Sequence, residues 1–354
     1  MIGKKIITIF VSGLFVLIPI SQSDAADIVM NIAFQAPTSH YSAQSVLYFK
    51  SQVELKSNGK IKVKMNDYGS WLKQQREEKN KKEQGSKLFF LDKEIPDAIS
   101  RGTIESGMVS LSRFSEEIPL TDIFFQPFLF DTKKKVELAT KSDSSIRKAI
   151  EREIKNLGLT VLWWQPYGSI VFVSNGEPIR NPEDMRRKKV RVFSRTMGNL
   201  TLSAGGIPVS ISNSRQHFAY KHGKVDIGMT TILEIHKHKT WEVMDTISLS
   251  NSANVQFLVL VSTRWWNSLD FRHRSIISNA AVETQKFAME NMKKMESNAF
   301  RKAIENGMTL AVLSDDDRDY WKEKSFPIYE KYLEDTGPVG QELIDLATET
   351  LIFE

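Results

Sequence analysis

Two segments of the chain share one pattern, and this pair constrains the fold more than any other feature. Residues 98–108 and 219–229 each contain the end of a helical stretch, a glycine, an acidic residue and an apolar run, with Gly102 and Gly223 lying 121 residues apart. Glycine commonly ends a helix because it adopts the left-handed conformation without steric cost. The pair predicts two similar α/β units, each presenting a strand end to a shared cleft. Chance similarity is the alternative, because the helix–glycine–strand order is common in α/β proteins.

Short apolar runs alternate with helical stretches along the rest of the chain. The strand-like runs are residues 28–34, 60–65, 159–164 and 189–193, and residues 270–305 form a long helical pattern. This alternation predicts the α/β class. The adjacent Trp163 and Trp164 are expected to lie mainly in the core, with stacking on a ligand as the alternative.

The first 25 residues have the layout of a secretory signal peptide. Lys4 and Lys5 precede an apolar run over residues 6–20, and small residues follow around Ala25. This arrangement predicts cleavage after residue 25 and export to the periplasm; an uncleaved anchor helix is the alternative, although the run is short for a bilayer span. Removal of the leader leaves 329 of the 354 residues, which suits two lobes better than one core.

Composition excludes several classes of protein. The chain has no cysteine, so it is not a lipoprotein and has neither disulfides nor a thiol nucleophile. The formal net charge of +5 resides largely in short runs at 133–135 and 186–189, which are expected to be solvated faces, although a basic surface also steers anions. No basic stripe with interleaved stacking aromatics is present, so no nucleic-acid partner is expected. The charged segment 73–87 predicts an exposed excursion.

No sequence motif for catalysis or for a cofactor is present. The chain lacks the glycine-rich nucleotide loops, the nucleophile elbow and the zinc-protease motif. His236 and His238 would face apart on a helix and are expected at the surface. Residues 315–317 follow Ser314 and predict a helix start rather than a cation site. We therefore expect no metal, no cofactor and no enzyme, while a dispersed Ser-His-Asp triad stays open.

Arg191 is the leading candidate for binding an anion. It lies in an apolar strand-like run between Val190 and Val192. An arginine is costly to bury unless it is paired, and its guanidinium matches a carboxylate with two parallel hydrogen bonds. The alternative from composition alone is an edge-strand arginine that faces solvent.

An ordered series of short motifs over nearly the whole mature chain resembles the solute receptors of tripartite ATP-independent periplasmic (TRAP) transporters. The series consists of Gly59-Lys-Ile-Lys-Val63, Gln126-Pro-Phe-Leu-Phe130, Pro178-Ile-x-x-Pro182-Glu-Asp-Met185 leading into Lys189-Val-Arg191-Val, then Gly223-Lys-Val-Asp226, Trp241-Glu-Val243, and Leu260-Val-Ser262 with Trp265-Trp266-Asn-Ser-Leu269. Each motif alone is weakly specific, and their order over this length is what makes the resemblance.

The resemblance implies a type II periplasmic-binding-protein fold, in which two α/β lobes flank a cleft, strands cross between the lobes and a long helix spans both. It implies lobe I at residues 26–167 plus about 256–295, and lobe II at 168–255 plus about 296–354. It also implies a monomer that binds a carboxylated solute in the cleft and delivers it to a membrane permease.

Ligand contacts carried over from the family fall on both lobes. Arg191 matches the family's ligand arginine. The other matched positions are Ser194, Asn213, Thr230 and Ser252 in the second lobe, and Gln35, Ser110 and Arg113 in the first, with Arg76 near a first-lobe ligand loop.

The sequence departs from the sialic-acid-binding members of the family. Ile170 stands where those members carry a second carboxylate-binding arginine, and residues 227–231 replace the family's usual acid-Asn-Pro segment. These departures predict a smaller or partly apolar acid rather than sialic acid. A sensor that presents a bound solute to a signalling partner, and a periplasmic α/β enzyme, are the alternative functions.

Overall fold

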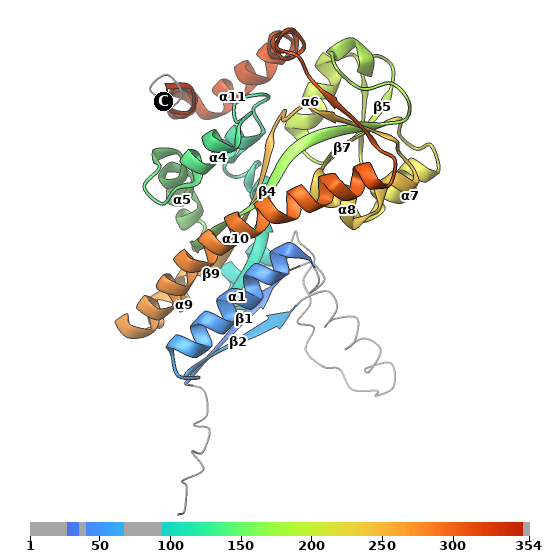
Figure 1. The fold of residues 1–354 in the computed structure, drawn as a ribbon. Helices are drawn as coiled ribbons and strands as arrows, with labels where there is room; N and C mark the ends of the chain where they lie inside the picture. Colours follow the sequence, from blue (N-terminus) through green and yellow to red (C-terminus); the bar gives the residue numbers. More distant parts are fainter. Residues whose placement is uncertain (1–26, 35–39, 67–93, 350–354) are drawn as a thin grey trace, which may run out of the picture.

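The chain forms two α/β lobes that share two long crossing strands (Figure 1). The computed structural model describes residues 27–34, 40–66 and 94–349. The predicted leader, Gln35, Arg76 and the charged segment 73–87 lie outside the described residues. Within those ranges, none of the helices is both long enough and apolar enough to span a bilayer.

Lobe I, as we use the name for the structure, is built on strands β1 to β3. Parallel pairing joins β1 to β2 and β3, and β3 pairs antiparallel with the crossing strand β9. Apolar side chains fill both faces of this part of the sheet. Its elements are β1 (Ile28–Ala33), α1 (Tyr41–Lys56), β2 (Ile61–Asn66), α3 (Ile95–Ser100), β3 (Ser106–Ser110), the 3₁₀ turns Leu111–Phe114 and Pro119–Phe125, α4 (Lys133–Thr140) and α5 (Ser145–Asn156).

Lobe II is built on a second set of strands whose order is β4-β7-β5-β6, with β8 and β10 on the other side of β4. Its elements are the 3₁₀ turn Pro182–Met185, β5 (Lys189–Val192), α6 (Arg195–Ser203), β6 (Ile207–Ser210), the 3₁₀ turn Asn213–Arg215, α7 (Gln216–Lys221), β7 (Ile227–Thr231), α8 (Ile232–Lys237), the 3₁₀ turn Thr240–Glu242, β8 (Thr246–Leu249) and β10 (Thr309–Val312).

The two similar sequence segments occupy equivalent places in the two lobes. Gly102 follows α3 with φ +76° and precedes β3, and Gly223 follows α7 with φ +58° and precedes β7. Both glycines therefore adopt the left-handed conformation that ends a helix. Since β3 and β7 are both buried, the prediction of two similar α/β units is confirmed.

Four further elements connect the lobes. They are β4 (Leu159–Ser174), β9 (Asn254–Ser262), α10 (Phe271–Glu305) and α11 (Asp315–Glu349), and the short helix α9 (Thr263–Ser268) follows β9. The helix predicted over 270–305 is thus confirmed, and Figure 1 shows it running diagonally across both lobes. The expected helix start at Ser314 is also confirmed, because Ser314 and Asp317 exchange hydrogen bonds of 2.9 and 3.1 Å between side chain and backbone.

The last helix belongs to both lobes. It kinks at Gly337, which has φ +60° and is followed by Pro338. Before the kink, Trp321 and Ile328 pack into the core of lobe II, whereas Leu343 and Ala347 after it pack into the core of lobe I. Segment 296–354, which we predicted to belong to lobe II, therefore contributes to both cores.

The strand β4 changes its register where it passes from one lobe to the other. Its pairing with β9 shifts between Pro166 and Gly168, and Gly168 has φ +104°. A Cβ at Gly168 would lie 2.9 Å from the carboxylate of Glu296 on α10. A glycine is required here both for the backbone conformation and for the close approach of α10. Trp163 and Trp164, just before the bulge, lie in the core as expected.

Candidate functional site

Arg191 lies on β5, a strand placed between β6 and β7 in lobe II. Its side chain is 1% exposed. Nε donates to the carbonyl of Ile211 at 2.9 Å, one terminal nitrogen donates to the carbonyl of Met229 at 2.5 Å, and the other donates to Oδ1 of Asn213. A guanidinium has five N–H donors, so this set leaves one N–H on each terminal nitrogen for a further acceptor.

The charge of Arg191 has no carboxylate partner in the described part of the chain. No Asp or Glu oxygen of those residues lies within 4.0 Å of its nitrogens, and its three acceptors are neutral. Burial lowers the pKa of Arg191, against the favourable charges of Tyr220 and Glu234, yet a guanidinium stays protonated in proteins. A buried cation without a counter-charge is costly, so the site favours an incoming anion.

Arg191 lies close to the boundary between the lobes. Its guanidinium stands over the ring of Phe193 at 5.4 Å, and Phe193 makes an edge contact with Phe125 of lobe I at 6.0 Å. Nearby, the hydroxyl of Thr196 in lobe II donates to the carboxylate of Asp122 in lobe I at 3.0 Å. Burial raises the pKa of Asp122, although hydrogen bonds from Ser115 and Thr196 oppose the shift.

The other second-lobe candidates lie at different distances from this cation. Asn213 holds the guanidinium directly. Thr230 follows Met229 and donates to Gln216 at 3.1 Å instead. Ser194 caps α6 by accepting from the backbone N–H of Met197 at 3.2 Å. The structure therefore brings Asn213 to Arg191 and gives Ser194 and Thr230 contacts of their own.

The remaining candidates are spread over both lobes. Ser110 ends β3 with its hydroxyl 2.9 Å from that of Ser112, and Arg113 is exposed in the turn that follows. Ile170 is 1% exposed in the apolar core of lobe II, and Ser252 is fully buried, with its hydroxyl 3.3 Å from Ser250. A direct role for these four residues in binding stays a prediction.

A second buried charged group, which the sequence analysis did not single out, lies in the same lobe. Glu234 on α8 is 1% exposed and accepts hydrogen bonds from Tyr167 of β4 and from Gln216, the latter at 3.4 Å. Its ion pairs reach Lys237 at 3.3 Å and His238 at 2.9 Å. Burial acts to raise the pKa of Glu234, but the hydrogen bond and charge of His238 with the charge of Lys237 hold it well below its usual range.

The sequence did contain a signal for this group. Glu234 is a lone acid among Ile232, Leu233 and Ile235, which is the pattern of a carboxylate carried into a core. His238, which we expected at the surface, is half-buried, because the single helical turn between them brings its imidazole to 2.9 Å from the carboxylate of Glu234.

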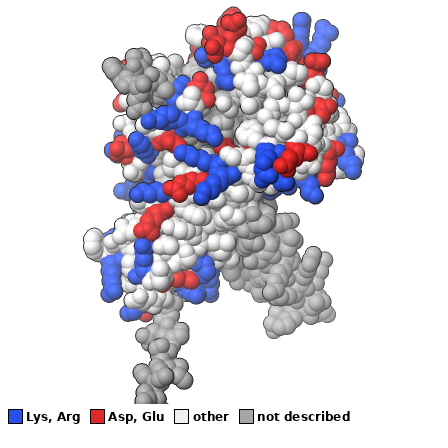
Figure 2. Space-filling model, viewed as in Figure 1, with Lys and Arg blue, Asp and Glu red and all other residues white. Residues whose placement is uncertain are grey.

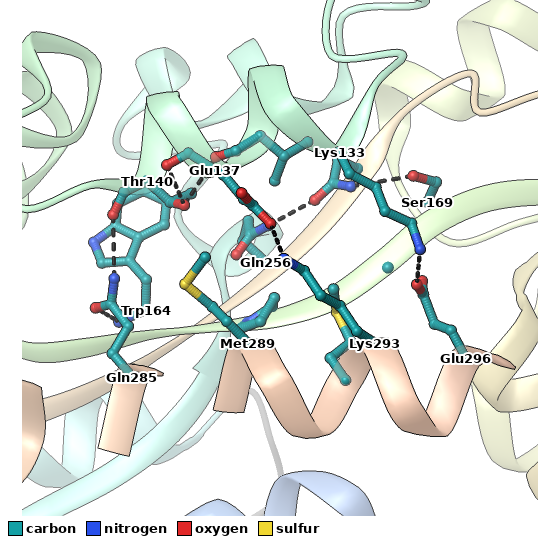
Figure 3. A pocket seen from close by; sticks show the side chains of 15 residues that line it. Lys133, Glu137, Thr140, Trp164, Ser169, Gln256, Gln285, Met289, Lys293 and Glu296 are labelled. Carbon is teal, nitrogen blue, oxygen red and sulfur yellow. Dashed lines mark hydrogen bonds and ion pairs between the residues drawn. The ribbon is translucent and has the colours of Figure 1, made fainter. Parts of the chain in front are cut away.

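A narrow pocket lies between α4 and α10, against the crossing strands β4 and β9 (Figure 3). Trp164, Met289 and Met292 give it apolar walls. Two ion pairs span it, Lys133 with Glu296 at 2.8 Å and Lys293 with Glu137 at 2.6 Å. Figure 2 shows basic and acidic side chains interleaved over this face, so the lysine run at 133–135 is locally compensated.

Two α/β lobes joined by crossing strands, with a buried arginine near their boundary that contacts no carboxylate of the described residues, are the features of a solute-binding receptor. The family description "Bacterial extracellular solute-binding protein, family 7", known as DctP, matches residues 32–335. The chain belongs to this family, and it is a solute-binding receptor of the TRAP type.

Relatives with known roles support the same assignment. The chain is 25% identical to the ectoine-binding periplasmic protein TeaA of Halomonas elongata, over 64% of this chain and 68% of the relative. It is also 25% identical to the C4-dicarboxylate-binding periplasmic protein DctP of Vibrio cholerae, over 73% and 76% of the two chains.

Solved structures confirm the predicted type II fold. The Bordetella pertussis receptor DctP7, which binds pyroglutamic acid, superposes with a TM-score of 0.79 at 16% identity, covering 90% of this chain and 99% of that one. A TRAP periplasmic solute-binding protein from Shewanella oneidensis with bound succinate gives a TM-score of 0.78 at 21% identity, covering 91% and 99%.

Proposed function

We propose that this receptor binds a small organic acid between its lobes and delivers it to the membrane permease of a TRAP transporter. One observation carries the proposal: Arg191 is a buried cation whose only described protein acceptors are neutral. The carboxylate of a solute would supply both the missing charge and the acceptor for its two remaining N–H groups.

The relatives support a carboxylate as the common feature of the solute. The curated and solved relatives are described as binding C4-dicarboxylates, ectoine, succinate, uronates and pyroglutamate. These solutes differ in size and polarity, whereas each bears a carboxyl group. We propose a solute of this class for the present chain, bound with micromolar or tighter affinity as a rough expectation for a closed polar site.

The further parts of the proposal concern the mature protein. We propose that residues 1–25 are a cleaved signal peptide, that the protein acts in the periplasm as a monomer, and that it is not an enzyme. The periplasmic relatives and the lysines and apolar run at its N-terminus support export. We also propose that the lobes divide at 167/168 and near 255/256, which the register shift of β4 next to Gly168 supports.

A panel of acids with matched neutral analogues tests the proposal. Thermal melting of the wild-type protein would be measured with succinate, pyroglutamate, ectoine and uronates, and with the corresponding amides where the acid has one. We expect at least one acid to raise the melting temperature and its amide to have no effect, because the amide has no charge to offer Arg191. Mass spectrometry of small molecules that co-purify would extend the panel. Equal stabilisation by an acid and by its amide would overturn the role of the carboxylate.

A further inference from the structure

Three side chains form a continuous hydrogen-bonded path from lobe I to lobe II. His40 immediately precedes α1 in lobe I, Tyr167 lies on the crossing strand β4, and Glu234 lies on α8 in lobe II. The three side chains are all buried, with exposed fractions of 8%, 6% and 1%. None of the three is among the ligand contacts predicted from the family.

The first contact fixes the tautomer of His40. Its Nδ1 accepts from the backbone N–H of Ser42 at 3.3 Å and lies 2.7 Å from the hydroxyl of Ser42, so it caps the N-terminus of α1. An accepting Nδ1 places the proton of the neutral ring on Nε2. Burial lowers the pKa of His40 to about 4, helped by the charge of Lys237 and opposed by that of Glu234, so the ring is neutral at pH 7.

The second contact extends the hydrogen-bonded path to the crossing strand, in the same donor-to-acceptor order. Nε2 of His40 lies 3.3 Å from the hydroxyl of Tyr167, and that hydroxyl donates to Oε1 of Glu234. His40 therefore donates to Tyr167, and Tyr167 donates to Glu234, with every donor and acceptor in one consistent order. The His40 and Tyr167 rings also stack at 5.6 Å, and Tyr167 packs against Phe257 of β9 at 4.7 Å.

The third contact links the path to the strand beside Arg191. Glu234 accepts from Gln216 at 3.4 Å, Gln216 accepts from Thr230 at 3.1 Å, and Thr230 follows Met229, whose carbonyl holds the guanidinium. The carboxylate that receives the path is itself fixed by Lys237 and His238. A change in the position of His40 relative to α8 would thus break a satisfied, buried network.

We propose that His40, Tyr167 and Glu234 form an interlobe latch, which holds lobe I against lobe II in the described arrangement and shifts the equilibrium from more open arrangements toward this one. The latch rests on the proposed function only in that closure is what a two-lobed receptor does with its solute. His40 and Tyr167 are positioning residues, since they act through the arrangement of the lobes and touch none of the acceptors around Arg191. Loss of one hydrogen bond of the path is expected to lower the closed-to-open ratio about five- to tenfold.

The experiment measures the distance between the lobes without any solute, so it is independent of the identity of the ligand. Because the chain has no cysteine, the exposed residues Lys148 in lobe I and Lys224 in lobe II can be replaced by cysteine and spin-labelled specifically. Pulsed electron paramagnetic resonance on this double-cysteine protein then gives the distribution of interlobe distances.

Two variants break the latch in different ways. Tyr167→Phe removes only the hydroxyl. His40→Asn keeps a side chain that caps a helix well but is too short to reach Tyr167, so it remains usable if Tyr167→Phe fails to fold. The matched control is Tyr332→Phe, which removes the hydroxyl of a tyrosine that is 4% exposed and whose oxygen has no hydrogen-bond partner in the described part of the chain.

The latch predicts that Tyr167→Phe and His40→Asn both shift the distribution to longer distances, that the double variant adds nothing to either, and that Tyr332→Phe matches the parent protein. A lower melting temperature with an unchanged distribution would show that Tyr167 only stabilises the core, and would overturn the latch. If the latch fails in this way while the acid panel succeeds, the receptor function stands without it.

Discussion

Arg191 and Glu234 are both buried, charged side chains of lobe II, and they differ in whether an opposite charge lies beside them. Glu234 lies 3.3 Å from the ammonium of Lys237 and 2.9 Å from the imidazole of His238, and it accepts a hydrogen bond from Tyr167. Arg191 has two backbone carbonyls and one amide oxygen. Among the described residues, the buried anion thus has a cation beside it, whereas the buried cation has only neutral acceptors.

This difference separates a structural charge from a binding charge. A buried ion costs several kcal/mol of desolvation, which only an opposite charge and a full set of hydrogen bonds offset. Evolution of a more stable core alone would favour an apolar residue or a nearby carboxylate at the position of Arg191. A cation held in place by neutral acceptors is instead already oriented for an anion, so less free energy is lost in ordering it when the anion binds.

The largest expected effect is on binding, from Arg191→Met. Removal of one partner of a buried, hydrogen-bonded charge pair costs about 2–5 kcal/mol, so the affinity for the acid found in the panel should fall about 30-fold or more. Arg191→Lys keeps the charge but loses the two parallel hydrogen bonds of the guanidinium. Its affinity for the acid should lie between those of Arg191→Met and the wild type. Titration calorimetry gives both affinities. Unchanged affinity in Arg191→Met would remove the central role of this residue.

The next effect is on stability, from Glu234→Gln. Glutamine keeps an acceptor for Tyr167 but leaves Lys237 without its counter-charge, so the free energy of unfolding should fall by about 3 kcal/mol. Without ligand, Arg191→Met should cost less than this, because it also removes an uncompensated buried cation. Urea unfolding of the two ligand-free variants makes the comparison. A larger loss in Arg191→Met than in Glu234→Gln would reverse the distinction between the two charges.

Much of the architecture around these charges could be predicted from the sequence. The glycines at 102 and 223, the helix start at Ser314 and the long helix over 270–305 are local signals, and the structure confirms them. Arg191 stood out because an arginine between two valines contradicts its apolar surroundings. Such features depend on residues that are neighbours in the chain, which a single sequence displays.

The partners of the charges could not be predicted, because they depend on register and on long-range pairing. The shift of β4 between Pro166 and Gly168 changes which side chains share a face, so alternation along the strand could not place Tyr167 next to Glu234. His40 and Glu234 also lie far apart in the sequence, with most of the residues of both lobes between them. Only the folded arrangement shows that Glu234 is compensated and Arg191 is not.

Acid should weaken the fold through His40. The unfolded chain binds a proton on this histidine at its ordinary pKa of 6.5, whereas burial lowers the folded pKa to about 4. Between these values unfolding takes up a proton, so stability is present above pH 6.5 and is lost as the pH falls toward 4, by on the order of 3 kcal/mol. Glu234, whose folded pKa is below its usual range, loses its contribution only at still lower pH.

The pH dependence can be assigned by comparison with His40→Asn, which caps α1 but does not titrate. Urea unfolding at several pH values should show a shallower loss between pH 6.5 and 4 in this variant than in the wild type. Asp122, whose pKa burial raises, changes stability in the opposite sense and is common to both proteins. Parallel curves for the two proteins would show that His40 does not carry the acid sensitivity.

The smallest effects are expected at the two ion pairs next to the crossing strands. They test whether loss of a charge partner costs more when the remaining charge is more buried. The carboxylate of Glu296 is 7% exposed and that of Glu137 is 31% exposed, while their lysine partners are 61% and 52% exposed. Lys133→Met leaves the more buried carboxylate without its partner and should cost about 1 kcal/mol of stability. Lys293→Met removes a pair open to water and should cost less than about 0.5 kcal/mol. Chemical unfolding of the two variants side by side measures the difference, and equal losses would mean that burial of the remaining charge does not set the cost in this protein.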